Sequence, residues 1–466
     1  MGLYLNHNDI RSLFPIITII AFYLLILLSI YIFRKQGSSD EYYISILGGI
    51  LCLFFSVSLW DTFSSALGGL IINDNYSLIF YVLILIGFVF SINLSAVERQ
   101  DKNYYLYAAL LLIGVMIVSS AGSLVTVFAG CELVCFSSFL LIDNREKRRW
   151  AFVLSYFLVS MTGLCAVFLV YSVAGTADIY GLKEYIILNG VQSKKMLGGF
   201  ILLSIFFVFK MSPLLISLVF NLGLNKINHT KMLLFNTSVK AAGLAALFRF
   251  VFIVMPWEEQ VWQTPILISG LVAMAYGCAL SLMAGKIRIS VSCIGAVHTG
   301  TVMVAIANGY EEANSLMLYY ISAYIFFNTG MLTTLSQIDN TKGLDGTCKG
   351  IYSNAVYALF CFFMICLAGV GFCIPVFNSL DGIILMLEGW KKIIFIVLIF
   401  VGAVSYARIC AKVFKRKKEK IDKTMSGGII QIPYVTGYIC LIIIILSVAI
   451  FPSLKEYLLE SLLYIY

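Results

Sequence analysis

The chain consists of long apolar runs separated by short polar connections. Fourteen runs approach or exceed the roughly 20 mostly apolar residues that a helix needs to cross a bilayer. They lie near 14–33, 43–60, 77–95, 104–119, 123–142, 151–174, 197–220, 232–254, 263–284, 290–308, 314–336, 353–379, 386–410 and 434–452. Apolar and polar residues do not alternate along them, as they do in the strands of a membrane barrel. Since only helices and closed barrels satisfy the backbone in lipid, the pattern predicts an all-α polytopic membrane protein of about 14 transmembrane helices.

The composition favours one membrane bundle over a series of soluble domains. The chain is 61% hydrophobic and 12% charged, whereas about 25% of the residues in a soluble globular chain are charged. No stretch rich in Pro, Ser or charge marks a linker, so residues 1–466 are expected to form a single transmembrane bundle. The first run is too long for the apolar core of a signal peptide, and no small-residue cleavage site follows it. It is therefore interpreted as a membrane span and not as a cleavable signal peptide.

Basic residues gather on one side of the predicted bundle. The loops after the odd-numbered runs hold 21 Lys and Arg residues, whereas the opposite side, termini included, holds seven. Because such residues accumulate in loops that stay in the cytoplasm, both termini are predicted to lie outside, with the basic loops in the cytoplasm or an organellar matrix. The net charge of +8 follows from this topology, and nothing indicates a nucleic-acid partner.

The twelve cysteines are interpreted as small buried apolar residues. None forms a CxxC pair and no histidine cluster accompanies them, so their spacing excludes the usual zinc and iron–sulfur sites. No strand–turn–helix context supports a nucleotide-binding glycine loop either. We therefore expect this chain to bind no metal and no other cofactor.

Four ionisable residues stand out inside the predicted spans: Glu132, Lys210, Lys240 and His298. A charged group at the bilayer centre costs about 2.5–3.5 kcal/mol, so those that remain commonly carry function. Glu132 is surrounded by apolar and small residues, and Lys210 precedes Pro213, which should kink or break the seventh helix. Lys240 and His298 have small neighbours, which permit close packing and leave room for water.

Each of these residues also has a structural interpretation. Glu132 could form an ion pair that locks two helices, and Lys210 could be a snorkelling lysine beside an ordinary proline kink. His298 could be a buried histidine with satisfied hydrogen bonds, or a proton relay, because imidazole titrates near neutral pH. Arg249, close to the end of the Lys240 helix, is interpreted as structural.

The functional interpretation implies a way of moving protons. Hydrocarbon surroundings disfavour a charged lysine, whereas a nearby carboxylate favours it. A change in the distance between Glu132 and Lys210 would therefore switch the lysine between holding and releasing its proton. Lys240 and then His298 would receive the proton along the bundle.

The segments around these residues resemble the antiporter-like membrane subunits of the complex I superfamily, the NADH–quinone oxidoreductases. Related subunits occur in membrane-bound hydrogenases and multi-subunit cation/proton antiporters. The resemblance runs from about residue 68 to 410 and is greatest for the N-type subunit. SSAGSLVTVFAGCELVCFSSFLLI resembles the family's glutamate helix, FKMSP its broken lysine helix, TSVKAAGLAALFR its second lysine helix and IGAVHTGTVMVAIA its histidine helix.

This resemblance implies fourteen helices that contain two inverted five-helix repeats, here at 104–254 and 263–410. Helices seven and twelve would be broken, at Pro213 and at the glycines and Pro375 of CLAGVGFCIPVFNSLDG. It also implies a proton-translocating subunit of a membrane-bound NADH–quinone oxidoreductase or related redox complex, with no active site of its own. Its partners would be other membrane subunits and the bilayer, in a bacterial cell membrane or an organellar inner membrane.

One position departs from the family pattern. The twelfth helix of the family usually carries a Lys or Glu that ends the proton path, but Ser379 occupies that position here. Asp381 lies two residues further on, about 200° around a helix, and is the candidate exit group unless the break shifts the register; Glu388 is a further candidate. Three readings stay open: proton translocation, which the intact Glu132, Lys210 and Lys240 favour; a structural, non-pumping subunit, which the missing charge favours; and cation/proton antiport without redox chemistry.

Overall fold

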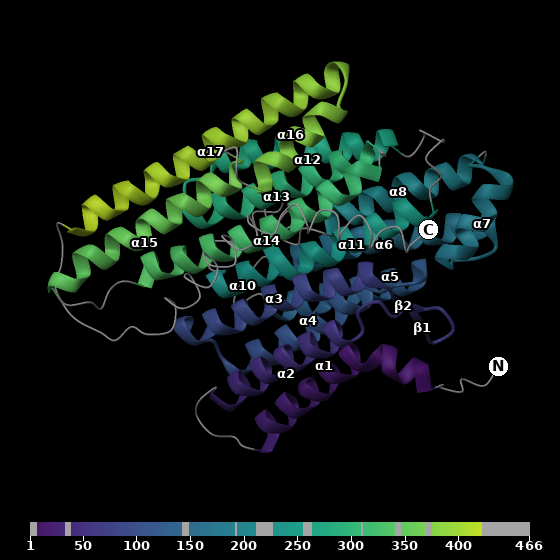
Figure 1. Ribbon diagram of the computed structural model, residues 1–466, viewed down its shortest axis with the longest axis horizontal. Helices are drawn as coiled ribbons and strands as arrows, with labels where there is room; N and C mark the ends of the chain where they lie inside the picture. The colour runs from purple at the N-terminus through teal and green to yellow at the C-terminus, as the bar shows by residue number, and fades with distance from the viewer. Residues whose placement is uncertain are drawn as a thin grey trace.

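The protein is a bundle of long helices that lie side by side, with α1 and α2 at one edge and α15 and α17 at the other (Figure 1). The computed structural model describes residues 7–32, 39–141, 149–191, 193–210, 227–254, 263–308, 311–340, 346–369 and 375–421. The first half of the described chain forms helices α1 (His7–Ile32), α2 (Ser39–Ser58), α3 (Asn75–Glu98), α4 (Lys102–Ser119), α5 (Leu124–Leu141), α6 (Arg149–Ala174), α7 (Ile179–Asn189) and α8 (Lys194–Lys210). The second half forms α10 (His229–Leu234), η2 (Phe235–Val239), α11 (Lys240–Arg249), η3 (Phe250–Val254), α12 (Gln263–Met283), α13 (Ile287–Ala307), α14 (Glu311–Asn340), α15 (Gly346–Leu367), α16 (Pro375–Met386) and α17 (Gly389–Ile421).

Eleven stretches of the described chain are long and apolar enough to cross a membrane. Each coincides with one of the predicted runs. The other three runs are the seventh, whose described part is the 17-residue α8, the twelfth, and the last, at 434–452, which lies outside the described residues. The predicted helical membrane architecture is thus confirmed, whereas the total of fourteen helices stays a prediction.

The twelfth run is divided between two helices, as its glycines and proline predicted. α15 ends at Leu367 and α16 begins at Pro375, a favourable place for proline because the first turn of a helix needs no backbone donor there. Gly369 has a φ of 71°, which lies in the left-handed region that suits glycine at the end of a helix. The corresponding Pro213 falls outside the described residues.

A small β-hairpin corrects the all-α prediction. Strands β1 (Ser64–Ala66) and β2 (Ile71–Asn73) pair antiparallel between α2 and α3. The turn contains Leu67, Gly68 and Gly69 at positive φ, and two of these three are glycines, which adopt that conformation without strain. A three-residue strand is too short for alternation to reveal in a sequence, and the short helix α7 was also not predicted.

The segment from His229 to Val254, called the central helix below, is the most buried span of the described chain. It contains α10, η2, α11 and η3, and it contacts α3, α4, α8, α13 and α14. Small residues such as Ala241, Ala242 and Gly243 let these neighbours approach closely. η2 and η3 are π-helical, a rare geometry that occurs often at functional sites. Lys240, at the start of α11, therefore lies at the centre of the bundle.

Candidate functional site

Glu132 and Lys210 form an ion pair between α5 and α8. The Nζ of Lys210 lies 2.9 Å from Oε1 of Glu132. The lysine side chain is 3% exposed and the glutamate side chain 38% exposed, so the pair reaches from the interior toward the surface of the chain. The two residues that the sequence singled out are thus brought together.

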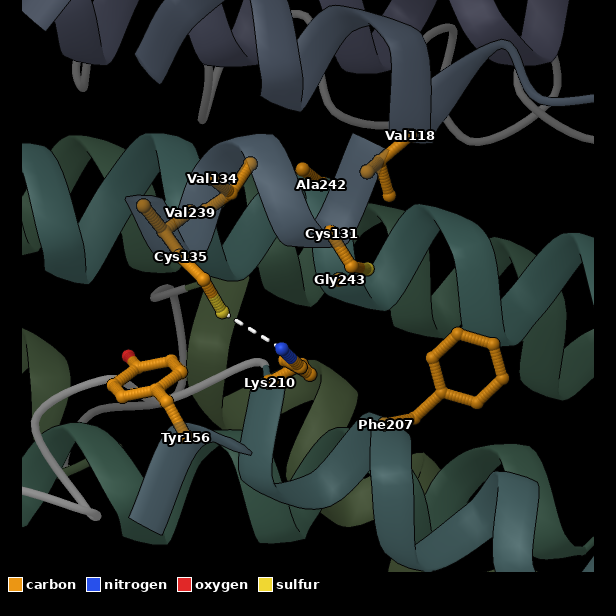
Figure 2. Close-up of a pocket in the computed structure, with 10 residues that line it drawn as sticks. All are labelled: Val118, Cys131, Val134, Cys135, Tyr156, Phe207, Lys210, Val239, Ala242 and Gly243. Carbon is orange, nitrogen blue, oxygen red and sulfur yellow. Dashed lines mark hydrogen bonds between the residues drawn. The ribbon is translucent and has the colours of Figure 1, made fainter. Parts of the chain in front are cut away.

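Lys210 has three hydrogen-bond acceptors, which match the three N–H groups of an ammonium. Besides Glu132, its Nζ donates to Oγ of Ser160 at 3.0 Å and to Sγ of Cys135 at 2.7 Å; Figure 2 shows the bond to the cysteine. The rings of Tyr156 and Phe206 lie 5.3 and 5.5 Å from the same atom, within reach of a cation–π interaction. Its surroundings therefore stabilise a positive charge at this lysine.

A cavity of about 10 Å³ connects this site with the central helix. Lys210, Tyr156 and Phe207 lie on one side of it, and Cys131, Val239 and Gly243 are among the residues on the other (Figure 2). This volume is about enough for one water molecule. Lys210 lines the cavity, whereas Lys240 does not, although Val239, Ala242 and Gly243 are its neighbours in the sequence.

Lys240 is buried without an ionic partner among the described residues. Its Nζ donates to the hydroxyl of Tyr324 at 3.1 Å and lies 5.3 Å from the centre of the same ring. The residue is 2% exposed. Nζ also packs against Gly295 of α13, where any Cβ would collide with it. Both lysines are interior, but the ammonium of Lys210 has a carboxylate partner and that of Lys240 has a neutral tyrosine hydroxyl.

Tyrosines link Lys240 to His298. Nδ1 of His298 lies 2.6 Å from the hydroxyl of Tyr320, and Nε2 bonds to the hydroxyl of Tyr406. The ring of Tyr324, the partner of Lys240, is 4.6 Å from the histidine ring. The result is two hydrogen-bonded groups in ring contact with each other, Lys240 with Tyr324 and His298 with Tyr320 and Tyr406, across α11, α14, α13 and α17.

Sequence reasoning found the charged members of this site and missed the tyrosines and the cysteine. Tyr320 and Tyr324 are four residues apart inside one span, so they share a helix face; that spacing was the available signal. Tyr406 is distant in the sequence, and no sequence pattern pointed to it. Cys135 was interpreted as an apolar filler, whereas it contacts the Lys210 ammonium.

The predicted exit residues do not join these two groups. Asp381 lies on an exposed part of α16, and Glu388 is exposed in the connection to α17. Neither forms a hydrogen bond or an ion pair with another residue in the described ranges. Ser379 is fully buried. Asp381 therefore stays a prediction as the exit group.

Arg249 forms a buried ion pair at the other end of α11 from Lys240. Its Nη2 lies 2.7 Å from Oδ1 of Asp74, and the two side chains are 1% and 9% exposed. Asp74 also caps α3 through the backbone N–H of Ser77, and the guanidinium lies over the ring of Tyr76. These contacts tie the start of α3 to the central helix, in agreement with the structural interpretation of Arg249.

Known proteins show the same combination of fold and sequence. Residues 121–408 match the model of the family described as NADH:quinone oxidoreductase/Mrp antiporter, transmembrane region. The chain is 24% identical over 322 residues to NADH-quinone oxidoreductase subunit N of Trichlorobacter lovleyi, covering 66% of this chain and 65% of that protein. It is 25% identical over 417 residues to NAD(P)H-quinone oxidoreductase subunit 2 of Microcystis aeruginosa, covering 84% of this chain and 79% of the relative.

Solved structures give the same fold. A chain of respiratory complex I from Thermus thermophilus superposes with a TM-score of 0.75 at 15% identity, over 95% of this chain and 98% of that one. A chain of the Mrp complex from Dietzia sp. superposes with a TM-score of 0.74 at 14% identity, over 97% of this chain and 51% of that one. The protein belongs to the NADH:quinone oxidoreductase/Mrp antiporter membrane-subunit family, as the resemblance of its helices predicted.

Proposed function

We propose that this protein is a proton-translocating subunit of a membrane-bound NADH–quinone oxidoreductase or a related redox-driven complex. Glu132 and Lys210 form the switchable pair, and Lys240 and His298 carry the proton onward. The relatives named subunit N and subunit 2 of quinone oxidoreductases support this assignment.

The observation that carries the proposal is the contrast between the two lysines. A subunit whose interior charges only hold helices together needs each charge to be paired, because an unpaired buried charge is costly. Lys210 meets that requirement, but Lys240 does not. An interior lysine with a tyrosine partner and a histidine beyond it is explained by proton transfer and not by helix packing.

The finer architecture belongs to the same proposal. We infer fourteen helices, two inverted repeats at 104–254 and 263–410, and breaks in helices seven and twelve. Both termini would lie outside and the basic loops inside. The partners would be other membrane subunits, which drive the Glu132–Lys210 pair by electrostatic or conformational coupling. This subunit would hold no redox cofactor and perform no electron transfer itself.

Replacement of Lys210 by methionine in the assembled complex tests the proposal. Methionine keeps the length of the side chain and removes the charge, so Glu132 loses its switchable partner. We expect electron transfer to persist while the number of protons moved per electron falls. The measurement is proton uptake or release by sealed vesicles during NADH oxidation, and Lys195→Met, an exposed lysine on the same helix, is the control.

A structural role for the pair predicts a different result. In that case Glu132→Gln would lower assembly or thermal stability, and the complex that remains would pump normally. A stable Glu132→Gln complex that transfers electrons without pumping counts against the structural reading. Normal pumping in both variants excludes the translocation reading.

A further inference from the structure

A second cluster of ionisable side chains lies at the start of the central helix. His229, the first residue of α10, lies between Glu98 of α3 and Asp339 of α14. Its Nδ1 is 2.7 Å from Oε1 of Glu98, and its Nε2 is 3.3 Å from Oδ2 of Asp339. Arg288 of α13 lies 3.1 Å from the same aspartate oxygen. Residues of four helices therefore form one cluster around the histidine, and none of them is Glu132, Lys210, Lys240 or His298.

The cluster is built around the helix terminus. Oε1 of Glu98 accepts the backbone N–H of His229, and Oε2 accepts both the backbone N–H and the hydroxyl of Thr230. A carboxylate at the positive end of a helix is favourable. The histidine is 1% exposed, whereas Asp339 and Arg288 are 18% and 32% exposed. The site thus has an accessible outer part and a buried inner part, with His229 as the inner member.

The cluster lies on the side that carries the basic loops. Glu98, Arg288 and Asp339 are close to Arg99, Lys286 and Lys342 in the sequence, all of which belong to the loops predicted to face the cytoplasm or matrix. The carboxylates at this position can attract protons from that compartment. α10 runs inward from there beside α3 and α14 (Figure 1).

A buried amide lies between this cluster and Lys240. Asn236 of η2 is fully buried, and within the described residues neither its Oδ1 nor its Nδ2 has a hydrogen-bond partner. Leaving such a group unsatisfied costs about 1–3 kcal/mol. Its Oδ1 and the Nζ of Lys240 both lie against Gly295 of α13. The amide oxygen therefore lies near the Nζ of Lys240.

The spacing along the central helix fits a stepwise route. Asn236 follows His229 by seven residues, about two helical turns or roughly 10 Å, which returns it to nearly the same face. Lys240 follows Asn236 by four residues, directly after the π-helical segment η2. On α14, Asn328 lies one turn from Tyr324, is buried, and has an Nδ2 with no partner in the described chain. Polar groups thus line both sides of the interval between His229 and Lys240.

We propose that the cluster of Glu98, His229, Arg288 and Asp339 is the proton entrance of this subunit, and that Asn236 leads from it to Lys240. His229 accepts a proton at Nε2, on the side of Asp339, and gives up the proton of Nδ1 through Oε1 of Glu98, which returns the imidazolium to imidazole. Water bridged by Asn236 accepts that proton and passes it to Lys240, which becomes an ammonium. Arg288 holds Asp339 in place beside the histidine. The inference rests on the proposed translocation function and adds its point of entry.

Two variants of the assembled complex test the entrance. His229→Asn retains a donor near Glu98 but cannot carry a proton, and Asn236→Leu removes the amide at similar volume. Groups that transfer protons typically contribute about 100-fold or more to a rate, so each variant should lower the protons moved per electron as far as Lys240→Met does. Thr237→Val is the matched control: the residue is equally buried in η2, and within the described residues its hydroxyl bonds only to the backbone carbonyl of Leu233.

The outcomes separate the entrance from the function itself. If Lys240→Met lowers the number of protons moved per electron, and both His229→Asn and Asn236→Leu leave this ratio unchanged, the proposed entrance is wrong and the translocation function stands. If Lys240→Met also leaves it unchanged, the translocation function fails and the entrance with it. If Thr237→Val lowers the ratio as much as Asn236→Leu, the effect is one of packing and the entrance is rejected. Thermal unfolding of each complex shows whether it is folded.

Discussion

A complex that carries Lys240→Met is expected to oxidise NADH while losing the proton transport that passes through this subunit. Methionine fills nearly the same volume beside Gly295 and Tyr324 but has no proton to exchange. The link between Lys240, Tyr324 and His298 is then interrupted at its start. Because proton-transferring groups contribute about 100-fold or more, flux through the subunit should become undetectable beside that of the remaining complex. The measurement is the number of protons moved per electron, from proton uptake by vesicles recorded together with electron transfer.

Lys240→Arg separates proton transfer from a structural role. Arginine keeps a positive charge and donors for Tyr324, but in proteins it does not deprotonate. A lysine that only supports the fold would be replaced by arginine with pumping retained. A lysine that carries protons cannot be replaced by arginine without loss of pumping, so we expect Lys240→Arg to behave like Lys240→Met. Restored pumping in the arginine variant would contradict the role assigned to Lys240.

Arg249→Met is expected to destabilise the protein by about 3–5 kcal/mol, the usual consequence of removing one partner from a buried ion pair. Asp74 would then remain in the interior without its countercharge. The stacking of the guanidinium on Tyr76 would be lost as well. Thermal unfolding of the purified complex, followed through this subunit, measures the effect as a lower midpoint temperature.

The double variant Asp74→Asn with Arg249→Met is the control for this prediction. Asparagine keeps the cap on Ser77, since Asn and Asp are comparable at the start of a helix, and it removes the unpaired charge. The double variant should therefore be more stable than Arg249→Met alone. Equal destabilisation of the two would show that the loss arises from packing and not from the stranded carboxylate.

Most of the fold was predictable because each membrane span is a local property of the chain. Apolar length alone located eleven spans that the structure contains, and the glycines before Pro375 located the division between α15 and α16. The hairpin β1–β2 was not predictable, because its strands are stabilised by distant partners. The N–H of Ile72, for example, bonds to the carbonyl of Ser120.

The site was predictable in its charges and not in its connections. Glu132, Lys210, Lys240 and His298 are conspicuous because charge is rare in these helices, and rarity is visible in the sequence. Tyr324 and Tyr406 are ordinary residues in a chain with 27 tyrosines, and only the three-dimensional arrangement distinguishes them. His229 was missed because it lies at a helix end, where a polar residue is unremarkable until Glu98 and Asp339 are seen beside it.

Proton transport through this subunit is proposed to require both Lys210 and Lys240, and one comparison of variants tests that requirement. Protons moved per electron are measured in vesicles for Lys210→Met, Lys240→Met and the double variant. Sites on one route are not additive, so we predict that the double variant falls no further than the more strongly affected single variant. A ratio equal to that of the unaltered complex in all three variants, or deficits that add in the double variant, would contradict the roles of the two lysines.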